Sequence, residues 1–284
     1  MITELKQSEK YLKDKGVQSP QADAEGIFMH LLNCDRAKLY TSDASLSESQ
    51  HQIIYEFIQR RATGEPLQYI LKQAYFYGFK FKSQKGVFIP RPETELLIDA
   101  VLRKVRNAKH EIRNILDLCT GCGNVAISLT KTLQHYRIFA SDVSVKATSL
   151  AKENALYNNI SDSVIIRNGD LFHPWQDKKD FFDAIVCNPP YIVRQELKHL
   201  PCDVKNEPLE ALDGGEDGLD FYRKIIKKAP LHLKEKGYIL FEISPDVVNG
   251  VTTLLNNDFC NLELIKDYNN RERIIVAQLN NNGL

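Results

Sequence analysis

The sequence predicts an α/β protein with an open, mostly parallel sheet that ends in an antiparallel hairpin and is preceded by a small helical bundle. From Arg91 onward, apolar strand-like runs alternate with helical segments, which is the pattern of βαβ units. The last two runs, 259–266 and 272–278, are separated only by a short turn, so they must pair as a hairpin. Residues 1–75 instead show apolar side chains at helical spacing. The chain therefore divides into a helical part and an α/β part.

The helical part is expected to contain three helices. The first ends at Gly16, the second begins at Ser19-Pro20, and the third runs from about Ser47-Glu48 to before Gly64. Aromatic residues then alternate along 75–90 between turn-forming residues, which indicates a β-hairpin. We predict a substrate-recognition domain over 1–75, a hairpin linker over 76–90 and an α/β domain over 91–284.

The α/β part is expected to open with a helix from Pro92 to about Ala108. Strands are expected at five apolar runs before the terminal hairpin: 113–118, 136–141, 163–167, 182–187 and 237–243. Helices are expected in four of the gaps, near 123–134, 144–158, 217–233 and 246–256. The remaining segment, 194–218, is interpreted as a flexible loop that holds a substrate. Open α/β sheets bind ligands at the carboxyl ends of their strands, so the residues that follow the strands are the functional candidates.

Composition describes an ordinary globular protein. The 284 residues carry 37 Lys+Arg and 37 Asp+Glu, so no basic surplus favours a nucleic-acid substrate. The six cysteines lack the spacing of a disulfide framework, and no apolar stretch has the length of a membrane span. The first residues are too charged for a signal peptide. We expect a cytoplasmic protein that does not bind a membrane.

A glycine-containing turn after the first strand of the sheet is the first candidate site. Residues 115–118 break into Cys119-Thr120-Gly121-Cys122-Gly123, where the backbone can approach a ligand closely. The pattern departs from G-x-G-x-x-G because residue 126 is alanine, which disfavours a pyrophosphate site. The next strand ends at Asp142, where a carboxylate can accept hydrogen bonds from ribose hydroxyls. Turn and acid together indicate an adenosine-type cofactor, although Asp142 could instead cap the following helix.

Two other patterns are compatible with metals, and we reject both. Cys119 and Cys122 form a C-x-x-C pair, but no second Cys/His pair with zinc spacing follows them. The acidic run that begins at Asp213 suggests a calcium loop, yet its twelfth position is Lys224 rather than glutamate. We expect no metal site and no disulfide.

Two further strands end in candidates for ligand contacts. Asp170 is placed to reach an adenine amino group with Leu171 against the ring, although Asn168-Gly169-Asp170 is equally typical of a simple turn. After 182–187 comes Asn188-Pro189-Pro190-Tyr191, whose prolines force the backbone out of the sheet. The Asn188 side-chain oxygen and the Pro189 carbonyl can each accept one hydrogen of an –NH2 group, while Tyr191 stacks on its plane. This set suits a flat amide or amine substrate, for which no separate general base is needed.

These motifs together resemble the class I S-adenosylmethionine-dependent methyltransferases, in the branch that methylates planar nitrogens. Three more stretches, 64–70, 89–95 and 207–212, resemble the HemK/PrmC family of peptide chain release factor glutamine N5-methyltransferases, and the resemblance covers nearly the whole chain. The string Arg91-Pro92-Glu93-Thr94-Glu95 is usually lacking in the related ribosomal-protein methyltransferases. The resemblance therefore favours release factors over a ribosomal protein, and over the adenine N6 of DNA or RNA.

The resemblance implies a class I methyltransferase fold and S-adenosylmethionine as cofactor. It implies methyl transfer to the glutamine of the Gly-Gly-Gln motif in class I release factors by a monomeric enzyme that acts on no nucleic acid directly. The implied cofactor-binding residues are Cys119, Thr120, Gly121, Cys122, Gly123, Asp142, Asp170, Leu171 and Asn188. The implied catalytic residues are Asn188, Pro189 and Tyr191, and the implied substrate-binding residues are Asn188, Pro189, Pro190, Tyr191, Arg91 and Glu93. For Glu93, a role in favourable charge at a helix start is equally expected. Cys119, Leu171 and Ser244 depart from the residues usual in the family.

Overall fold

A computed structural model describes residues 1–41, 45–107 and 112–280 of the chain. These residues form two compact units. The first, called here the helical unit, comprises Met1–Gln73, Ser83–Lys85 and Leu200–Asn206. The second, the methyl-site unit, comprises Ala74–Lys82, Gly86–His199 and Glu207–Leu284. The segment 200–206 thus belongs to the helical unit, although the residues before and after it in the chain belong to the other unit.

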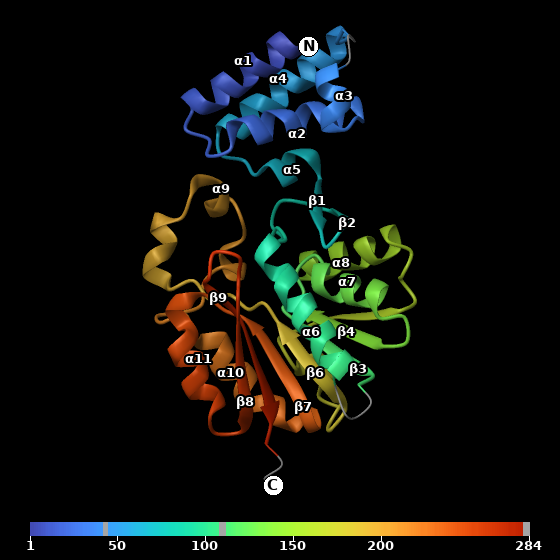
Figure 1. The fold of residues 1–284 in the computed structure, drawn as a ribbon, viewed down its shortest axis with the longest axis vertical. Helices are drawn as coiled ribbons and strands as arrows, with labels where there is room; N and C mark the ends of the chain where they lie inside the picture. The colour runs from blue at the N-terminus through green and yellow to red at the C-terminus, as the bar shows by residue number, and fades with distance from the viewer. Residues whose placement is uncertain (42–44, 108–111, 281–284) are drawn as a thin grey trace. The chain divides into compact units, whose positions relative to one another are not determined.

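The helical unit contains α1 (Ile2–Asp14), α2 (Pro20–Leu32), α3 (Arg36–Thr41), α4 (Glu48–Ala62) and α5 (Leu67–Leu71) (Figure 1). The segment 200–206 adds the short helix α9 (Cys202–Lys205). Helix α2 begins at Pro20, as the sequence predicts, and α4 begins with a capping box between Ser47 and Gln50. Their apolar faces enclose a core that includes Leu12, Phe28 and Ile54. The short helices α3 and α5 were not predicted, because six and five residues are too few for a clear helical period.

The methyl-site unit contains a seven-stranded sheet in the order β5-β4-β3-β6-β7-β9-β8. The strands are β3 (Asn114–Leu118), β4 (Arg137–Asp142), β5 (Val164–Asn168), β6 (Phe182–Cys187), β7 (Leu233–Glu242), β8 (Phe259–Lys266) and β9 (Glu272–Leu279). All pairs from β5 to β7 are parallel, while β9 is antiparallel to both β7 and β8. The predicted parallel sheet with a terminal antiparallel hairpin is confirmed.

Helices cover both faces of this sheet (Figure 1). One face packs against α10 (Asp220–Lys228) and α11 (Val248–Leu255), and its core includes Ile185 and Phe241. The other packs against α6 (Glu95–Asn107), α7 (Asn124–Thr132) and α8 (Val145–Tyr157), with Val186 and Leu240 in its core. Successive residues of β6 and β7 therefore serve opposite faces, as the pleat requires. The expected end of the α6 helix at Ala108 lies outside the described residues.

The predicted hairpin consists of β1 (Gln73–Phe76) and β2 (Phe79–Lys82), shorter than the 75–90 range that aromatic alternation suggests. Phe76 and Phe81 are buried in the core shared with α6. Asn154 of α8 and its C-cap residue Asn158 hold the backbone of the hairpin: Lys82 N donates to Asn154 Oδ1 at 2.6 Å, and Asn158 Nδ2 donates to the Lys80 carbonyl at 3.1 Å. From Ala74 on, the hairpin packs as part of the methyl-site unit.

Two element boundaries differ from the sequence-based expectation. The helix predicted over 217–233 is α10, which ends at Lys228, because Pro230 lacks the N–H that would continue it. Strand β7 begins at Leu233 rather than 237, since Leu233 pairs with Phe182 ahead of an irregularity in the register. Among the described residues, no helix combines the length and the apolar character needed to cross a membrane.

Candidate active site

The turn between β3 and α7 is shaped by positive backbone angles. Gly121 and Gly123 have φ of +56° and +85°, and Cys119 has φ of +57°. Cys119, where the family usually has glycine, thus adopts the left-handed conformation that favours glycine, a local strain of about 1–2 kcal/mol. A Cβ added at Gly121 would meet nothing within 4 Å, so the turn has open space beside it. Such space is what a ligand cradled by the turn requires.

A buried carboxylate beneath the turn fixes its shape. Asp117, in β3, is 1% exposed, and its Oδ2 accepts hydrogen bonds from the Thr120 hydroxyl at 2.6 Å and the Ala126 N–H at 3.1 Å. Burial raises the pKa of Asp117 to about 7. The sequence alone indicates no role for Asp117, although an acid inside an apolar strand is a recognisable signal.

Asp142 lies at the carboxyl end of β4, beside the turn. Its Oδ2 accepts from Gly121 N and its Oδ1 from Ser144 N, both at 2.9 Å. Burial raises the pKa of this carboxyl. The alternative role as helix cap is wrong, because α8 is capped by Ser144, whose side chain accepts from Ala147 N. Asp142 instead joins the 119–123 turn to the end of β4.

Asp170 and Leu171 follow β5 but differ in exposure. Asp170 is exposed, and its carbonyl accepts from His173 N at 2.8 Å. Leu171 is 8% exposed with φ of +45°, and its carbonyl accepts from the Ser141 hydroxyl at 3.1 Å. The turn expected from Asn168-Gly169-Asp170 is present.

The segment Asn188-Pro189-Pro190-Tyr191 follows β6, and both prolines are buried. Asn188 Nδ2 donates to the Thr94 hydroxyl at 3.1 Å, and the Tyr191 hydroxyl donates to Glu242 Oε1 at 3.2 Å. Thr94 and Glu242 are 1% and 2% exposed. Neither received a role from the sequence, although Thr94 lies in the stretch 89–95, which carries the family resemblance.

A glycine-containing segment supports the Tyr191 backbone from below. Ile192 N donates to the Leu212 carbonyl at 3.0 Å, and Gly214 N donates to the Ile192 carbonyl at 2.8 Å. A Cβ at Gly214 would lie 2.7 Å from two backbone atoms of Tyr191. The run after Asp213 thus packs on the candidate site. Among the described residues no His, Cys, Asp or Glu cluster has metal-binding geometry, and the six cysteines are free.

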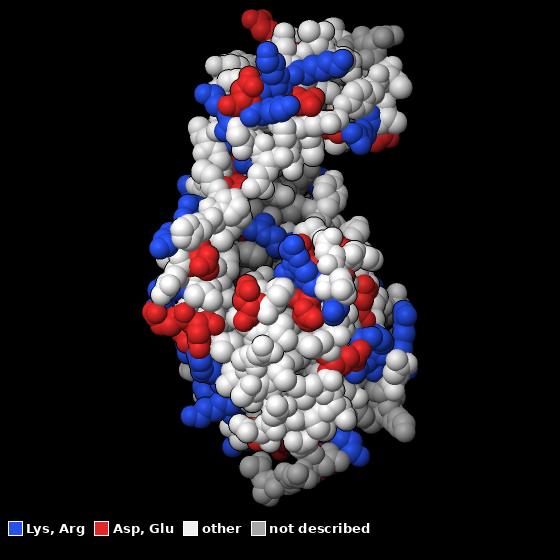
Figure 2. Space-filling view, turned by 60° about the vertical axis from the view of Figure 1, so that its left-hand side comes forward, with Lys and Arg blue, Asp and Glu red and all other residues white. Residues whose placement is uncertain are grey.

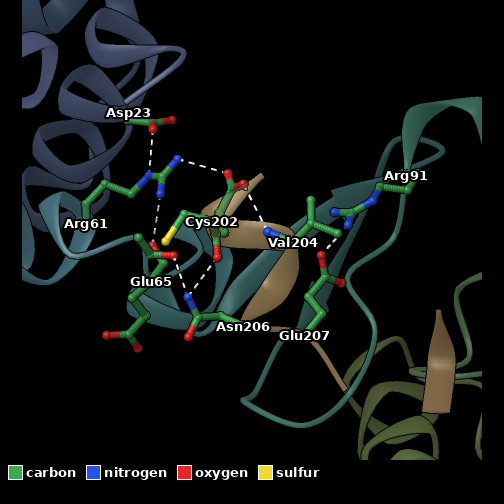
Figure 3. Close-up of polar contacts among 10 residues, drawn as sticks. Asp23, Arg61, Glu65, Arg91, Cys202, Val204, Asn206 and Glu207 are labelled. Atoms are coloured by element: carbon green, nitrogen blue, oxygen red, sulfur yellow. Dashed lines mark hydrogen bonds and ion pairs between the residues drawn. The ribbon is translucent and has the colours of Figure 1, made fainter. Parts of the chain in front are cut away.

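Arg91 and Glu93 flank the site through η1 (Pro92–Thr94). The Arg91 guanidinium forms an ion pair with the buried Glu207 (Figure 3) and lies 4.9 Å from the centre of the Phe88 ring. Glu207 also accepts from Ile89 N at 2.9 Å. Through this ion pair with Glu207, Arg91 holds the end of the loop that follows Tyr191. Glu93 is partly exposed beside the site.

The residues just before Glu207 are held within the helical unit (Figure 3). Arg61 donates to Asp23 at 2.7 Å and to Asp203 at 3.1 Å. Asn206 Nδ2 donates to the Gly64 carbonyl at 3.0 Å. The loop expected to be flexible therefore contains anchored helical turns, η3 (Arg194–His199), α9 (Cys202–Lys205) and η4 (Leu209–Ala211).

The turn at 119–123 and the ends of β4 and β6 meet at one edge of the sheet, because β3 lies between β4 and β6. The donors and acceptors there fit S-adenosylmethionine: open space at Gly121 next to the α7 N-terminus, the Asp142 carboxylate for ribose hydroxyls, and the apolar Leu171. Ser244, the third departure from the family, has φ of −93°, an ordinary value for serine.

The fold and this edge of the sheet define a class I S-adenosylmethionine-dependent methyltransferase. Residues 4–71 match the family described as PrmC N-terminal domain, and residues 78–205 match the methyltransferase small domain. A protein of Thermodesulfovibrio yellowstonii named release factor glutamine methyltransferase is 42% identical over 258 residues, which cover 90% of this chain and 91% of that one. A protein of the same name from Clostridium acetobutylicum is 36% identical over 94% of each chain. The chain belongs to the release factor glutamine methyltransferase family.

Solved structures agree on the fold. A methyltransferase from Pyrococcus furiosus aligns with a TM-score of 0.52 at 15% identity, over 82% of this chain and 98% of that one. The hMettl16 catalytic domain, solved with a 3′UTR hairpin, aligns with a TM-score of 0.58 at 15% identity over 84% of each chain. At such identities the likeness concerns the fold alone.

Proposed function

We propose that this protein transfers the methyl group of S-adenosylmethionine to the side-chain amide nitrogen, N5, of the glutamine in the Gly-Gly-Gln motif of class I peptide chain release factors. The observation that carries the proposal is the Asn188 side chain, whose Nδ2 is engaged by Thr94 and whose Oδ1 is thereby left to accept a hydrogen from a substrate amide. The names of the family members supply the class of substrate.

The chemistry follows from positioning. A glutamine amide is a poor nucleophile because its nitrogen lone pair is delocalised into the carbonyl. Asn188 Oδ1 and the Pro189 carbonyl accept the two amide hydrogens, which favours positive charge on the nitrogen as the new bond forms. Tyr191 packs on the amide plane, and Pro190 keeps the segment stiff. S-adenosylmethionine supplies the methyl group from its sulfonium.

Other residues of the site have supporting roles. We assign the cofactor to Cys119, Thr120, Gly121, Cys122 and Gly123, with Asp142, Asp170, Leu171 and Asn188. Besides residues 188–191, we assign substrate contacts to Glu93 and Arg91. Arg91 acts through the loop that it holds. The domain roles expected from the sequence, recognition over 1–75, a linker over 76–90 and methyl transfer over 91–284, belong to the same proposal.

The partner is proposed to be a release factor and not a nucleic acid or membrane. Acidic and basic side chains are mixed on the face drawn in Figure 2, which suits a protein partner better than a polyanion. We propose a cytoplasmic monomer. Six free cysteines fit a reducing compartment, and sedimentation measures the oligomeric state. The alternative substrates to compare with the release factor are a glutamine of a ribosomal protein and the adenine N6 of DNA or RNA.

The test is tritiated methyl transfer to purified release factor and to the same factor with alanine in place of the Gly-Gly-Gln glutamine. Labelling of the first alone is expected, and equal labelling overturns the proposal. DNA, RNA and ribosomal protein serve as competing acceptors.

A matched pair of variants distinguishes the role in methyl transfer assigned to Asn188 from the role in cofactor binding assigned to Asp142. Asn188→Ala is expected to abolish methyl transfer while calorimetry still detects cofactor binding. Asp142→Ala is expected to weaken cofactor binding by about 10- to 100-fold through lost hydrogen bonds. Near-normal turnover of Asn188→Ala contradicts the role assigned to the asparagine.

A further inference from the structure

The Asn188 amide is the outer end of a chain of polar contacts that reaches a buried carboxylate. Asn188 Nδ2 donates to the Thr94 hydroxyl at 3.1 Å. The Thr94 hydroxyl also lies close enough to the Glu242 carboxylate to lower its pKa, without a hydrogen bond of ordinary length between them. Tyr191 donates to Glu242 Oε1 at 3.2 Å from the other side. The two ends of Asn188-Pro-Pro-Tyr191 therefore depend on one buried acid.

The acid sets the direction of every hydrogen bond in the chain. An ionised carboxylate only accepts, so the Tyr191 hydroxyl donates to Glu242 and the Thr94 hydroxyl can meet it only as a donor. Glu242 Oε2 is buried and has no hydrogen-bond partner among the described residues, so it is the acceptor open to the Thr94 hydrogen. Having donated its hydrogen, the Thr94 oxygen can only accept from Asn188, which must present its NH2 inward and its Oδ1 outward.

We propose that Thr94 and Glu242 are positioning residues for the methyl-transfer reaction: the ionised Glu242, acting through the Thr94 hydroxyl, holds the Asn188 amide in the orientation that accepts a hydrogen from the substrate. This inference rests on the proposed function. Neither residue touches the substrate in this scheme. The opposite amide orientation presents a donor to the substrate –NH2 group, and two donors repel.

Protonation of Glu242 releases the chain. A neutral carboxyl can donate to Thr94, and Thr94 can then donate outward to Oδ1, so the amide is no longer held with Oδ1 toward the substrate. Burial raises the pKa of Glu242 to about 7, with Thr94 and Tyr191 lowering it less than burial raises it. Two further facing groups act on this balance: Glu93 of η1 raises the pKa and Arg273 of β9 lowers it. The Tyr222 hydroxyl of α10 faces the same residue and donates to the Glu242 backbone carbonyl at 2.7 Å. The active orientation is therefore favoured above neutral pH.

The experiment compares Thr94→Val with Thr94→Ser. Valine keeps the shape and removes the hydroxyl, whereas serine keeps the hydroxyl. We expect Thr94→Val to lower kcat on release factor by about 10- to 100-fold, with KM for release factor and the Kd of S-adenosylmethionine changed little. Thr94→Ser is expected to restore most of kcat. Full kcat in Thr94→Val overturns the inference, and so does equal loss in both variants.

The pH profile tests the same inference without relying on any variant to fold. Wild-type kcat is expected to fall as pH drops through about 7, where Glu242 takes up a proton, and Glu242→Gln is expected to lose that limb. A flat wild-type profile between pH 6 and 8, at constant cofactor binding, overturns it. Labelling of the Gly-Gly-Gln glutamine by the wild-type enzyme is measured first. If that labelling is not specific, the proposed function fails; if it is specific but the pH profile is flat, only this inference fails.

Discussion

The hydroxyl of Thr120 donates a 2.6 Å hydrogen bond to the carboxylate of Asp117, three residues earlier in the chain. The bond closes the turn between β3 and α7 over a side chain that is 1% exposed. The same carboxylate oxygen accepts from the first turn of α7 at Ala126, so one buried acid joins strand, turn and helix. The turn is therefore held by its contacts with Asp117, while the space beside Gly121 stays open.

We expect Thr120→Val to destabilise the protein by about 1–3 kcal/mol, because it leaves a buried acceptor short of one donor. The Kd of S-adenosylmethionine should rise, since the turn loses its closing bond. Urea denaturation and calorimetry measure the two effects. Thr120→Ser keeps the donor and serves as the control; equal behaviour of the two variants would show that the hydroxyl does not matter.

Asp117 also predicts a pH dependence of stability. Its pKa is raised from 3.8 to about 7 in the folded protein, so the folded state binds the proton more tightly than the unfolded chain does. The stabilisation from this group is thus fully present below about pH 4 and is lost as pH rises toward 7. Asp117→Asn keeps an oxygen that can accept both hydrogen bonds and removes the titration. The difference in unfolding free energy between wild type and Asp117→Asn should decline from pH 5 to pH 8, and a constant difference contradicts the assignment.

The sequence alone located the strand ends well, because strand-like runs and the glycines and prolines that end them are local signals. It placed Asp142 and Asn188 at the ends of β4 and β6, where the structure has them. It could not assign Thr94 or Glu242, because their roles arise from contacts with Asn188 and Tyr191, 94 and 51 residues away in sequence. Periodicity carries no information about such contacts.

The segment after Tyr191 shows the same limit. Its residues have no clear period, so a flexible loop is the natural expectation. In the structure, Asn206 is bonded to the Gly64 carbonyl within the helical unit, while the next residue, Glu207, accepts from Ile89 N within the methyl-site unit. Adjacent residues with partners in different units cannot be inferred from local sequence.

Gly214 is expected to be intolerant of any side chain. An added Cβ would lie 2.7 Å from the carbonyl carbon and Cα of Tyr191, which are backbone atoms that cannot turn away. Gly214→Ala should therefore shift Tyr191 and lower methyl transfer by about 100-fold, the usual effect of a misplacement near 1 Å. The neighbouring Glu216→Ala is the control, because its side chain is 78% exposed and pairs only with Arg194 among the ion pairs of the described residues. Normal turnover of Gly214→Ala would mean that Tyr191 does not need this support.

Arg61 is expected to be the most sensitive charged position of the helical unit. Its side chain is 8% exposed and lies between Asp23, 13% exposed, and Asp203, 34% exposed. Burial raises the pKa of Asp23, and hydrogen bonding to Arg61 counters that effect. Arg61→Leu leaves the Asp23 charge without compensation, which costs about 3–5 kcal/mol in buried pairs, whereas replacing both partners by apolar residues is often neutral.

The measurement uses two signals, because two units need not unfold together. The single tryptophan, Trp175, is buried in the methyl-site unit, so its fluorescence reports that unit, while far-ultraviolet circular dichroism reports both. Arg61→Leu should move the dichroism transition to lower urea by more than the fluorescence transition. The double variant Asp23→Leu/Arg61→Leu should recover most of the loss. An unchanged midpoint in Arg61→Leu, or a double variant as unstable as the single one, would show that the buried pair does not hold the helical unit together.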